Sequence, residues 1–255
     1  GRYSSKQMQH VWSDAFKFGT WRRAWVALAE AQHELGMPQV SAAYIDELRR
    51  AADEPIDYEF ADAEEGRIRH DVMAHLNEFR RHCPTAGGIL HLGATSMDIG
   101  DNAYLLQMRE AVKLLKPGFV NTLTNLGKFA MEKKDLVTLA FTHYQPAQPT
   151  TVGKRTAIWA YDLLFDLQAV EGAERLLSLA RGVKGATGTQ DSFLTLFDGD
   201  AVKVRALDEL FAEKLGFSGV HPVSGQTYTR KIDAMVVGSV SGLGSSAHKF
   251  AVDLR

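Results

Sequence analysis

The feature that most constrains the fold is a long stripe of apolar residues with helical spacing after Asn102. It consists of Leu105, Leu106, Met108, Val112, Leu115, Val120, Leu123, Leu126 and Phe129. This spacing places apolar side chains along one face of an α-helix. Pro117 interrupts the stripe, so we expect a kink there. A helix of this length needs other helices to cover its apolar face, which predicts a bundle.

Helical periodicity continues through most of the remaining chain. Expected helices cover a segment around 21–35 that Gly36 and Pro38 end, a segment from Ser41, and roughly 60–81, 151–179, 201–215 and 227–255. Alternation of the strand type is weak throughout. We therefore expect an all-α fold with a small N-terminal helical domain, residues 1–95. Residues 96–255 would form long helices of a bundle domain that is incomplete.

The expected helices also bear on assembly. Their broad apolar faces exceed what three or four neighbours in one chain can cover, so we expect an oligomer. The last helical pattern has no stop signal before Arg255, which predicts that the chain is a fragment.

Charge and cysteine content narrow the classes of function. The formal net charge of −2 over 255 residues gives no reason to expect a nucleic-acid or membrane surface. No apolar run has membrane-spanning length. Cys83 is the only cysteine, so an internal disulfide is impossible and we expect an intracellular, cytoplasmic protein.

Two polar clusters in the first third could bind an anion. Arg2-Tyr3-Ser4-Ser5 offers a guanidinium, a phenol and hydroxyls for a phosphate, although it could equally be a solvated terminus. Arg69-His70-Asp71, with His75 nearby, could bind an anion or form a surface salt-bridge cluster. The spacing of His70 and His75 does not suit a metal site on one helix face.

A third cluster runs from His91 to Asn102. Thr95 and Ser96 lead towards a helix N-terminus, where hydroxyls and free N–H groups can bind a carboxylate. Simple helix capping by Ser96, Asp98 and Asn102 is the alternative.

A fourth cluster is the segment from Phe141 to Gln148, which suits a turn that presents polar groups. His143 could act as a general acid or base, with Thr142 and Gln148 positioning a substrate.

Two further polar loops precede the end of the chain. Residues 182–190 are glycine-rich without the spacing of a nucleotide-binding loop. Residues 224–231 carry amides and hydroxyls, including Gln226. Either loop could be a plain connection.

Together these clusters resemble the adenylosuccinate lyase family of the fumarase/aspartase superfamily, over essentially the whole chain. The segments with Thr95-Ser96 and Thr142-His143 are similar to two regions shared across the superfamily. Residues 69–75 and 225–231 are similar to segments more particular to the family, and 146–148 and 184–190 resemble its animal-type branch.

The resemblance implies an all-α homotetramer whose long helices meet in a core and whose active sites are shared between subunits. It implies a small nucleotide substrate, with no nucleic-acid or membrane partner. The implied reaction is β-elimination of fumarate from adenylosuccinate, giving AMP, and from the succinylated aminoimidazole carboxamide ribotide of purine biosynthesis. Neither a metal nor an organic cofactor is implied.

The resemblance also implies roles for individual residues. His143 matches the general acid, and His70 matches a residue that assists or orients it. Substrate-binding positions match Arg2, Tyr3, Arg69, His70, Asp71, Thr95, Ser96, Thr142 and Gln226. Arg2 and Tyr3 would hold the phosphate, whereas Thr95, Ser96 and Thr142 would surround the succinyl carboxylates. His91 matches a histidine near the active site, with no role assigned.

One departure from the family pattern is large. The third shared region, which carries the catalytic serine base, does not occur. Gly244-Ser245-Ser246 looks similar, but Ala247-His248-Lys249 follows it within a helical pattern, so neither serine is assigned as the base. We expect this chain alone to be inactive.

Two alternatives stay open at the level of sequence. The protein could be a sister lyase acting on argininosuccinate or on a simpler amino or hydroxy acid. It could also be a non-catalytic structural homologue.

Overall fold

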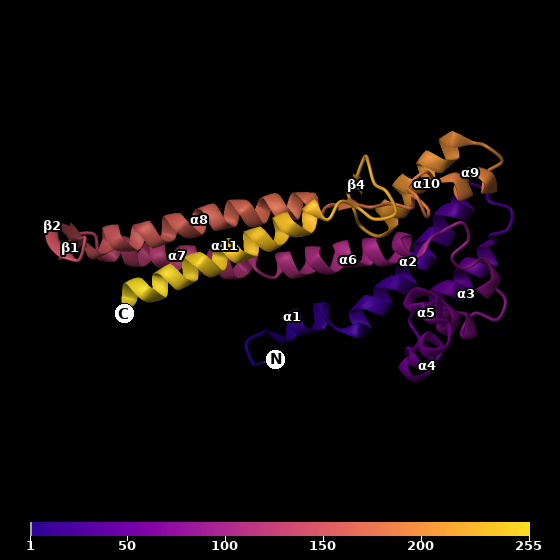
Figure 1. Cartoon of the computed structure of the whole chain (residues 1–255), viewed down its shortest axis with the longest axis horizontal. Coiled ribbons are helices and arrows are strands. Elements are labelled where there is room, and N and C mark those ends of the chain that lie inside the picture. The colour runs from indigo at the N-terminus through magenta and orange to yellow at the C-terminus, as the bar shows by residue number, and fades with distance from the viewer. Residues whose placement is uncertain (1) are drawn as a thin grey trace. The chain divides into compact units, whose positions relative to one another are not determined.

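Helices make up most of the fold, with only short strands between them, as the sequence predicts. The computed structural model describes residues 2–255, coloured along the chain in Figure 1. The chain forms two compact units. Unit 1 comprises Gly1–Glu110 and Leu177–Arg230, and unit 2 comprises Ala111–Leu176 and Lys231–Arg255. The expected domain boundary at residue 95 stays a prediction.

Unit 1 is built from short and medium helices around an aromatic and aliphatic core. Its elements are α1 (Lys6–Val11), α2 (Asp14–Glu34), α3 (Ala42–Ala52), α4 (Tyr58–Ile68), α5 (Asp71–Arg81), η1 (Gly87–Ile89), most of α6 (Ser96–Lys113), β3 (Leu179–Ala180), α9 (Asp191–Leu196), α10 (Ala201–Lys214) and β4 (Gly219–Val220). Trp25, Phe79 and Phe211 are fully buried within the core. The side chain of Ser41 caps α3, as the sequence suggests.

The helix expected over residues 60–81 is wrong in one respect, because it is two helices. Arg69 ends α4 with φ of 59°, in the left-handed region. His70 then caps α5 through its side chain. The Arg69-His70-Asp71 segment therefore lies at the junction of two helices: Arg69 and His70 are their caps, and Asp71 is the first residue of α5. Apolar spacing continues across the break, and histidine is an uncommon cap, so local pattern did not reveal it.

Unit 2 contains the long helices α7 (Lys116–Glu132), α8 (Val152–Leu176) and α11 (Lys231–Leu254). Helix α8 packs against both α7 and α11. The expected kink at Pro117 is instead a break, since α6 ends at Lys113 and Pro117 lies in the first turn of α7. Proline is tolerated there because the N–H it lacks would have no partner within the helix.

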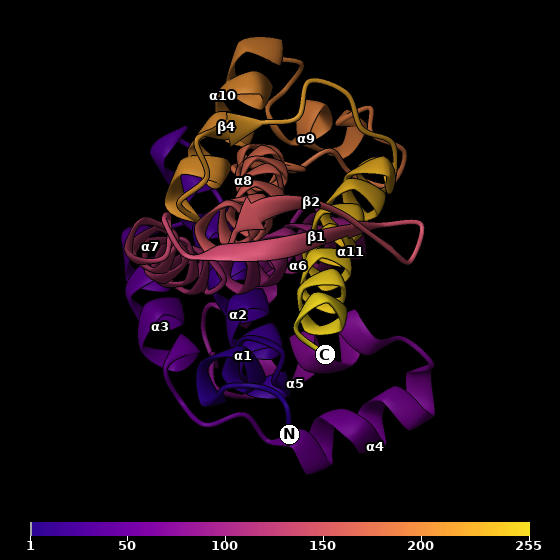
Figure 2. The ribbon, with the colours of Figure 1, turned by 90° about the vertical axis from the view of Figure 1, so that its left-hand side faces the viewer.

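The strands of unit 2 were not expected. Strands β1 (Val137–Thr142) and β2 (Gln145–Thr151) form an antiparallel hairpin, visible in Figure 2. Pro146 and Pro149 remove the alternation that normally identifies a strand, and both are tolerated in an isolated two-stranded ribbon.

Within residues 2–255, no helix has both the length and the apolar character needed to cross a bilayer.

Candidate functional site

The N-terminus of α6 carries the two predicted hydroxyl residues. Ser96 is the first residue of the helix, and Thr95 precedes it. The carboxylate of Asp98 accepts a hydrogen bond from the backbone N–H of Thr95 at 2.8 Å, which completes one half of a capping box. Within residues 2–255, the structure records no hydrogen bond to the Thr95 hydroxyl.

A buried ion pair fixes this helix end. Arg181 and Asp98 both have side-chain exposures of 0%, and Arg181 Nη1 donates to Asp98 Oδ1. The same carboxylate accepts from the backbone N–H groups of Lys184 at 2.8 Å and Gly185 at 3.2 Å. Arg181 Nη2 donates to the carbonyls of Gly185 and Gly225, each at 3.1 Å. One buried pair therefore joins α6, the glycine-rich loop and the loop that carries Gln226.

A second carboxylate of α6 anchors the loop of residues 224–230. Asp101 Oδ2 accepts from the backbone N–H of Tyr228 at 3.0 Å, and Oδ1 accepts from Arg230 at 2.6 Å. Burial raises the pKa of Asp101, and the bonds from Arg230 and Tyr228 partly oppose this. Gln226 is exposed in the anchored loop, so its amide is free to meet a ligand.

Two of the predicted clusters meet directly in unit 1. His70 Nδ1 accepts from the backbone N–H of Met73 at 3.3 Å, so a neutral His70 carries its proton on Nε2. That Nε2 lies 3.0 Å from Ser96 Oγ and can donate to it. Arg69 and Asp71 flank His70 and are exposed. The structure thus joins the segments 69–71 and 95–96, which are 26 residues apart.

Arg2 and Tyr3 lie in the turn before α1. The Arg2 guanidinium is 5.6 Å from the centre of the Tyr3 ring, which is 93% exposed. Within residues 2–255, the structure records no hydrogen bond from this pair to the other predicted site residues.

Thr142 and His143 belong to unit 2, at the tip of the β1–β2 hairpin. Thr142 pairs with Gln145, so His143 and Tyr144 form a two-residue turn. Both turn residues have positive φ, 51° and 56°, in a turn type that favours Asn-Gly. Bulky residues held this way cost conformational energy and are concentrated at functional sites. The predicted turn is present, and His143 is exposed in it.

Part of this arrangement has no local sequence signal. Arg181 lies 83 residues from Asp98, next to a glycine-rich segment that gives no hint of a buried cation. Asn102 closes the cluster of residues 91–102, for which the sequence leaves ligand binding and capping open, and its amide donates to Asp98 O at 2.7 Å and to Gly182 O at 3.0 Å. In the described part of the chain, no three His, Cys, Asp or Glu side chains gather as a metal site would require.

Comparison with known sequences places this geometry in context. A family model described as Lyase matches residues 2–255. Adenylosuccinate lyase of Saccharomyces cerevisiae is 50% identical over 256 residues, covering 100% of this chain and 53% of that protein. Adenylosuccinate lyase of Caenorhabditis briggsae is 44% identical over 245 residues, covering 96% of this chain and 51% of that protein. The chain spans about half the length of the curated relatives it matches.

Solved structures show the same fold. A fumarate lyase from Mesorhizobium sp. BNC1 superposes with a TM-score of 0.87 at 24% identity, over 98% of this chain and 57% of that one. A β-carboxy-cis,cis-muconate cycloisomerase from Acinetobacter calcoaceticus sp. ADP1 gives 0.84 at 22% identity, with the same coverages of 98% and 57%. These similarities support the helical architecture and carry no argument about substrate.

Proposed function

We propose, from the premise that this chain belongs to the lyase family, that the whole protein is an adenylosuccinate lyase. It would release fumarate from adenylosuccinate to give AMP, and from the succinylated aminoimidazole carboxamide ribotide of purine biosynthesis. One observation carries the proposal: four fungal and animal adenylosuccinate lyases are 43–50% identical to this chain over 96–100% of its length.

The charged residues of unit 1 suit an anionic nucleotide. Arg2 and Tyr3 would bind the phosphate, with the guanidinium giving bidentate contacts. Arg69 and Asp71 are exposed beside His70 at the α4–α5 junction, and Gln226 is exposed on its anchored loop. The positive φ of Arg69 supports a binding role, since such strain is concentrated at functional positions.

The hydroxyls suit the succinyl carboxylates. When Ser96 Oγ accepts from His70 Nε2, its own proton is free to be donated to a carboxylate oxygen. Thr95 lies beside it at the positive end of the α6 dipole, which also favours an anion. Thr142 would contribute from the hairpin.

The proposed reaction begins with removal of a proton from Cβ of the succinyl group. The negative charge then moves onto the adjacent carboxylate, where the hydroxyl and N–H donors stabilise it. The C–N bond breaks, a C=C bond forms in fumarate, and the departing nitrogen takes the electron pair. His143 donates a proton to that nitrogen, and His70 assists. No residue of this chain is proposed as the base, so the chain alone would be inactive.

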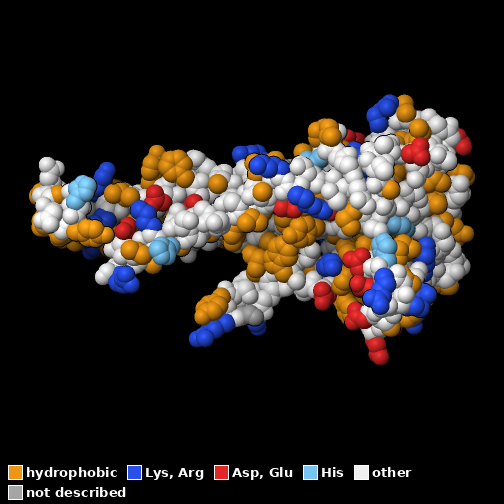
Figure 3. Space-filling view, viewed as in Figure 1, with side chains coloured by type: hydrophobic (Ala, Val, Ile, Leu, Met, Phe, Trp, Pro, Cys, Tyr) orange, Lys and Arg blue, Asp and Glu red, His pale blue; other side chains and the backbone are white. Residues whose placement is uncertain are grey.

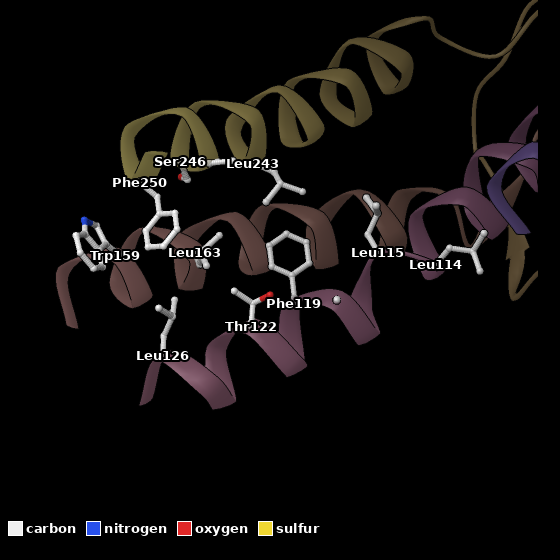
Figure 4. Close-up of a pocket in the computed structure, with 12 residues that line it drawn as sticks. Leu114, Leu115, Phe119, Thr122, Leu126, Trp159, Leu163, Leu243, Ser246 and Phe250 are labelled. Atoms are coloured by element: carbon white, nitrogen blue, oxygen red, sulfur yellow. The ribbon is translucent and has the colours of Figure 1, made fainter. Parts of the chain in front are cut away.

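The exposed apolar surface of unit 2 supports assembly into a homotetramer with shared active sites. Its helices expose apolar side chains to solvent, including Val120, Met131, Tyr161, Phe165, Met235 and Val237. Figure 3 shows apolar side chains in orange on one face of the molecule. An open groove of about 390 Å³ also lies between α7, α8 and α11, as Figure 4 shows. Phe119, Trp159 and Phe250 line it. Surfaces of this kind mark protein contacts.

We also propose a cytoplasmic location, based on the single cysteine.

The decisive test uses the full-length protein with adenylosuccinate and follows the absorbance change on release of AMP and fumarate. His143→Ala should lower kcat about 10²- to 10⁴-fold, the usual contribution of a general acid. His33→Ala is the control, because His33 is exposed at the end of α2 and outside the proposed site. Full activity of His143→Ala would contradict the mechanism.

A second pair of variants tests the nucleotide specificity. Arg69→Gln should raise KM for adenylosuccinate about 10- to 100-fold, the effect of losing a charged hydrogen bond. Arg67→Gln is its control, since the Arg67 side chain is 68% exposed and, within residues 2–255, its recorded ion pair is with Glu64 of the same helix. Turnover of argininosuccinate in place of adenylosuccinate would identify a sister lyase, and no turnover of either would favour a non-catalytic homologue.

A further inference from the structure

His91 is held in an unusual conformation in the loop between η1 and α6. Its φ is 67°, a left-handed conformation that is uncommon for residues other than glycine. Two hydrogen bonds hold the backbone at and just after this residue: Ala94 N–H donates to His91 O at 3.1 Å, and the Gln32 side chain donates to Leu92 O at 2.8 Å. The surrounding structure therefore fixes the direction in which the imidazole points.

The buried indole of Trp25 determines which nitrogen of His91 holds the proton. Trp25 is 1% exposed, and its Nε1 lies 3.0 Å from His91 Nδ1. An indole N–H can only donate, so Nδ1 must accept. The proton of the neutral ring is therefore on Nε2, and within residues 2–255 the structure records no partner for that nitrogen. His91 is partly exposed, and Nε2 is not among the buried side-chain atoms without a partner, so Nε2–H can meet a ligand.

Burial of the ring favours the same neutral state. Burial lowers the pKa of His91 to about 4; Asp98 on α6 raises it, while Arg80 on α5 and His70 lower it. A charged ring would also place an N–H on Nδ1 facing the indole N–H, and two donors would then oppose each other. His91 is thus built to donate from Nε2 without becoming a cation.

We propose that Trp25 is a positioning residue that locks His91 in the Nε2–H tautomer, so that His91 donates a hydrogen bond to an anionic oxygen of the bound substrate. The choice of substrate rests on the proposed function, whereas the tautomer does not. Both the phosphate and the carboxylates of adenylosuccinate offer such an oxygen. AMP carries only the phosphate and fumarate carries only carboxylates, so the two products distinguish the sources.

The test is ¹⁵N NMR of the full-length protein labelled at its histidine rings, with His91 assigned through His91→Gln. In the wild type, Nε2 should be protonated and Nδ1 unprotonated from pH 8 to pH 5. In Trp25→Phe, the two tautomers should mix and the ring should begin to titrate nearer pH 6.5. Addition of AMP or of fumarate should shift the Nε2 signal, and whichever does so identifies the bound group.

Trp21→Phe is the matched control. Trp21 lies one turn earlier on α2 and is 3% exposed, so the substitution removes the same atoms from a buried indole without touching His91. For adenylosuccinate, kcat/KM should fall about tenfold further in Trp25→Phe than in Trp21→Phe, the effect of one hydrogen bond to a charged group.

Several results would overturn the proposal. A wild-type His91 that carries its proton on Nδ1, or is charged at pH 6, would do so without any variant having to fold. Equal tautomer populations and kinetics in Trp25→Phe and Trp21→Phe would also overturn it. So would an Nε2 signal that neither product moves in a protein that turns over adenylosuccinate. Absence of turnover with the Nε2–H tautomer intact would instead contradict the proposed function and, with it, the substrate named here.

Discussion

Replacing Asp98 by asparagine should destabilise unit 1 strongly, because the two oxygens of this carboxylate accept hydrogen bonds from four residues. The carboxylate pairs with Arg181 and accepts from the N–H groups of Thr95, Lys184 and Gly185. Asparagine keeps the size of the side chain but removes the charge. It also replaces one oxygen by an NH₂ group, which faces donors that need an acceptor.

The magnitude follows from burial. Arg181 has an exposure of 0% and would keep its charge without a compensating anion. Removing one partner of a buried pair costs about 3–5 kcal/mol. The carbonyls of Gly182, Gly185 and Gly225 still accept from Arg181, so we expect about 3 kcal/mol. At a urea dependence of about 2 kcal/mol/M, the midpoint for unit 1 should fall by about 1.5 M.

Urea unfolding of the full-length protein, followed by tryptophan fluorescence, provides the measurement. Asp46→Asn is the control, since Asp46 is 66% exposed and pairs with Arg49 at 3.7 Å on the surface of α3. Such a pair contributes about 0.3–0.5 kcal/mol. A second variant, Asp98→Asn with Arg181→Met, should recover only part of the loss, because asparagine has one acceptor oxygen where the carboxylate offers two to the N–H groups of Thr95, Lys184 and Gly185. Equal midpoints for Asp98→Asn and Asp46→Asn would refute the reasoning.

Three further predictions concern backbone strain and pH. Gly182→Ala should lower the free energy of unfolding, measured in urea, by about 2–3 kcal/mol, because its φ of 79° is unfavourable for alanine and a Cβ would collide with the buried carboxylate on α10. Gly185→Ala is the control: its φ is 73°, nothing lies within 4 Å of an added Cβ, and the loss should be about 1 kcal/mol. The pKa of His91 is lower in the folded protein than in the unfolded chain, so the folded state is fully stable with respect to this group above pH 6.5 and loses stability as the pH falls from 6.5 towards 4. The free energy of unfolding should fall by about 3 kcal/mol over this range, measured by urea unfolding. In His91→Gln this contribution to the pH dependence should be absent. Asn-Gly in place of His143-Tyr144 should raise the thermal midpoint, because these residues adopt the two positive φ values at lower energetic cost, and should lower kcat about as much as His143→Ala does. A lowered midpoint would show that the native turn is not strained.

The sequence predicted the helices well where an apolar face repeats over several turns, as in α7 and α8. It failed where a local event interrupts a pattern that continues on both sides. The left-handed Arg69 separates two helices whose apolar faces are both regular. The hairpin carries Pro146 and Pro149, so no strand alternation could be recognised. In both cases tertiary contacts outweighed local propensity.

The motif residues could be found from the sequence, but the side chains that hold them could not. Thr95-Ser96 and His70 are recognisable because each sits in a short polar segment. Arg181 and Trp25 support those segments across 83 and 66 residues of chain, and a buried tryptophan looks like any other core residue. No local spacing rule connects residues so far apart, since their proximity depends on the packed fold.

Hydrogen bonding at Nδ1 divides the three histidines discussed above, His70, His91 and His143, into two kinds. His70 and His91 each have Nδ1 occupied by an N–H donor, from the Met73 backbone in one case and from Trp25 in the other. Each neutral ring must therefore present Nε2–H, so neither can accept a proton at Nδ1 without losing a bond that holds its segment. His143 stands instead at an exposed hairpin tip. In the proposed reaction, the two constrained rings bind and orient the substrate. Proton transfer is assigned to His143, for which no such bond is recorded within residues 2–255.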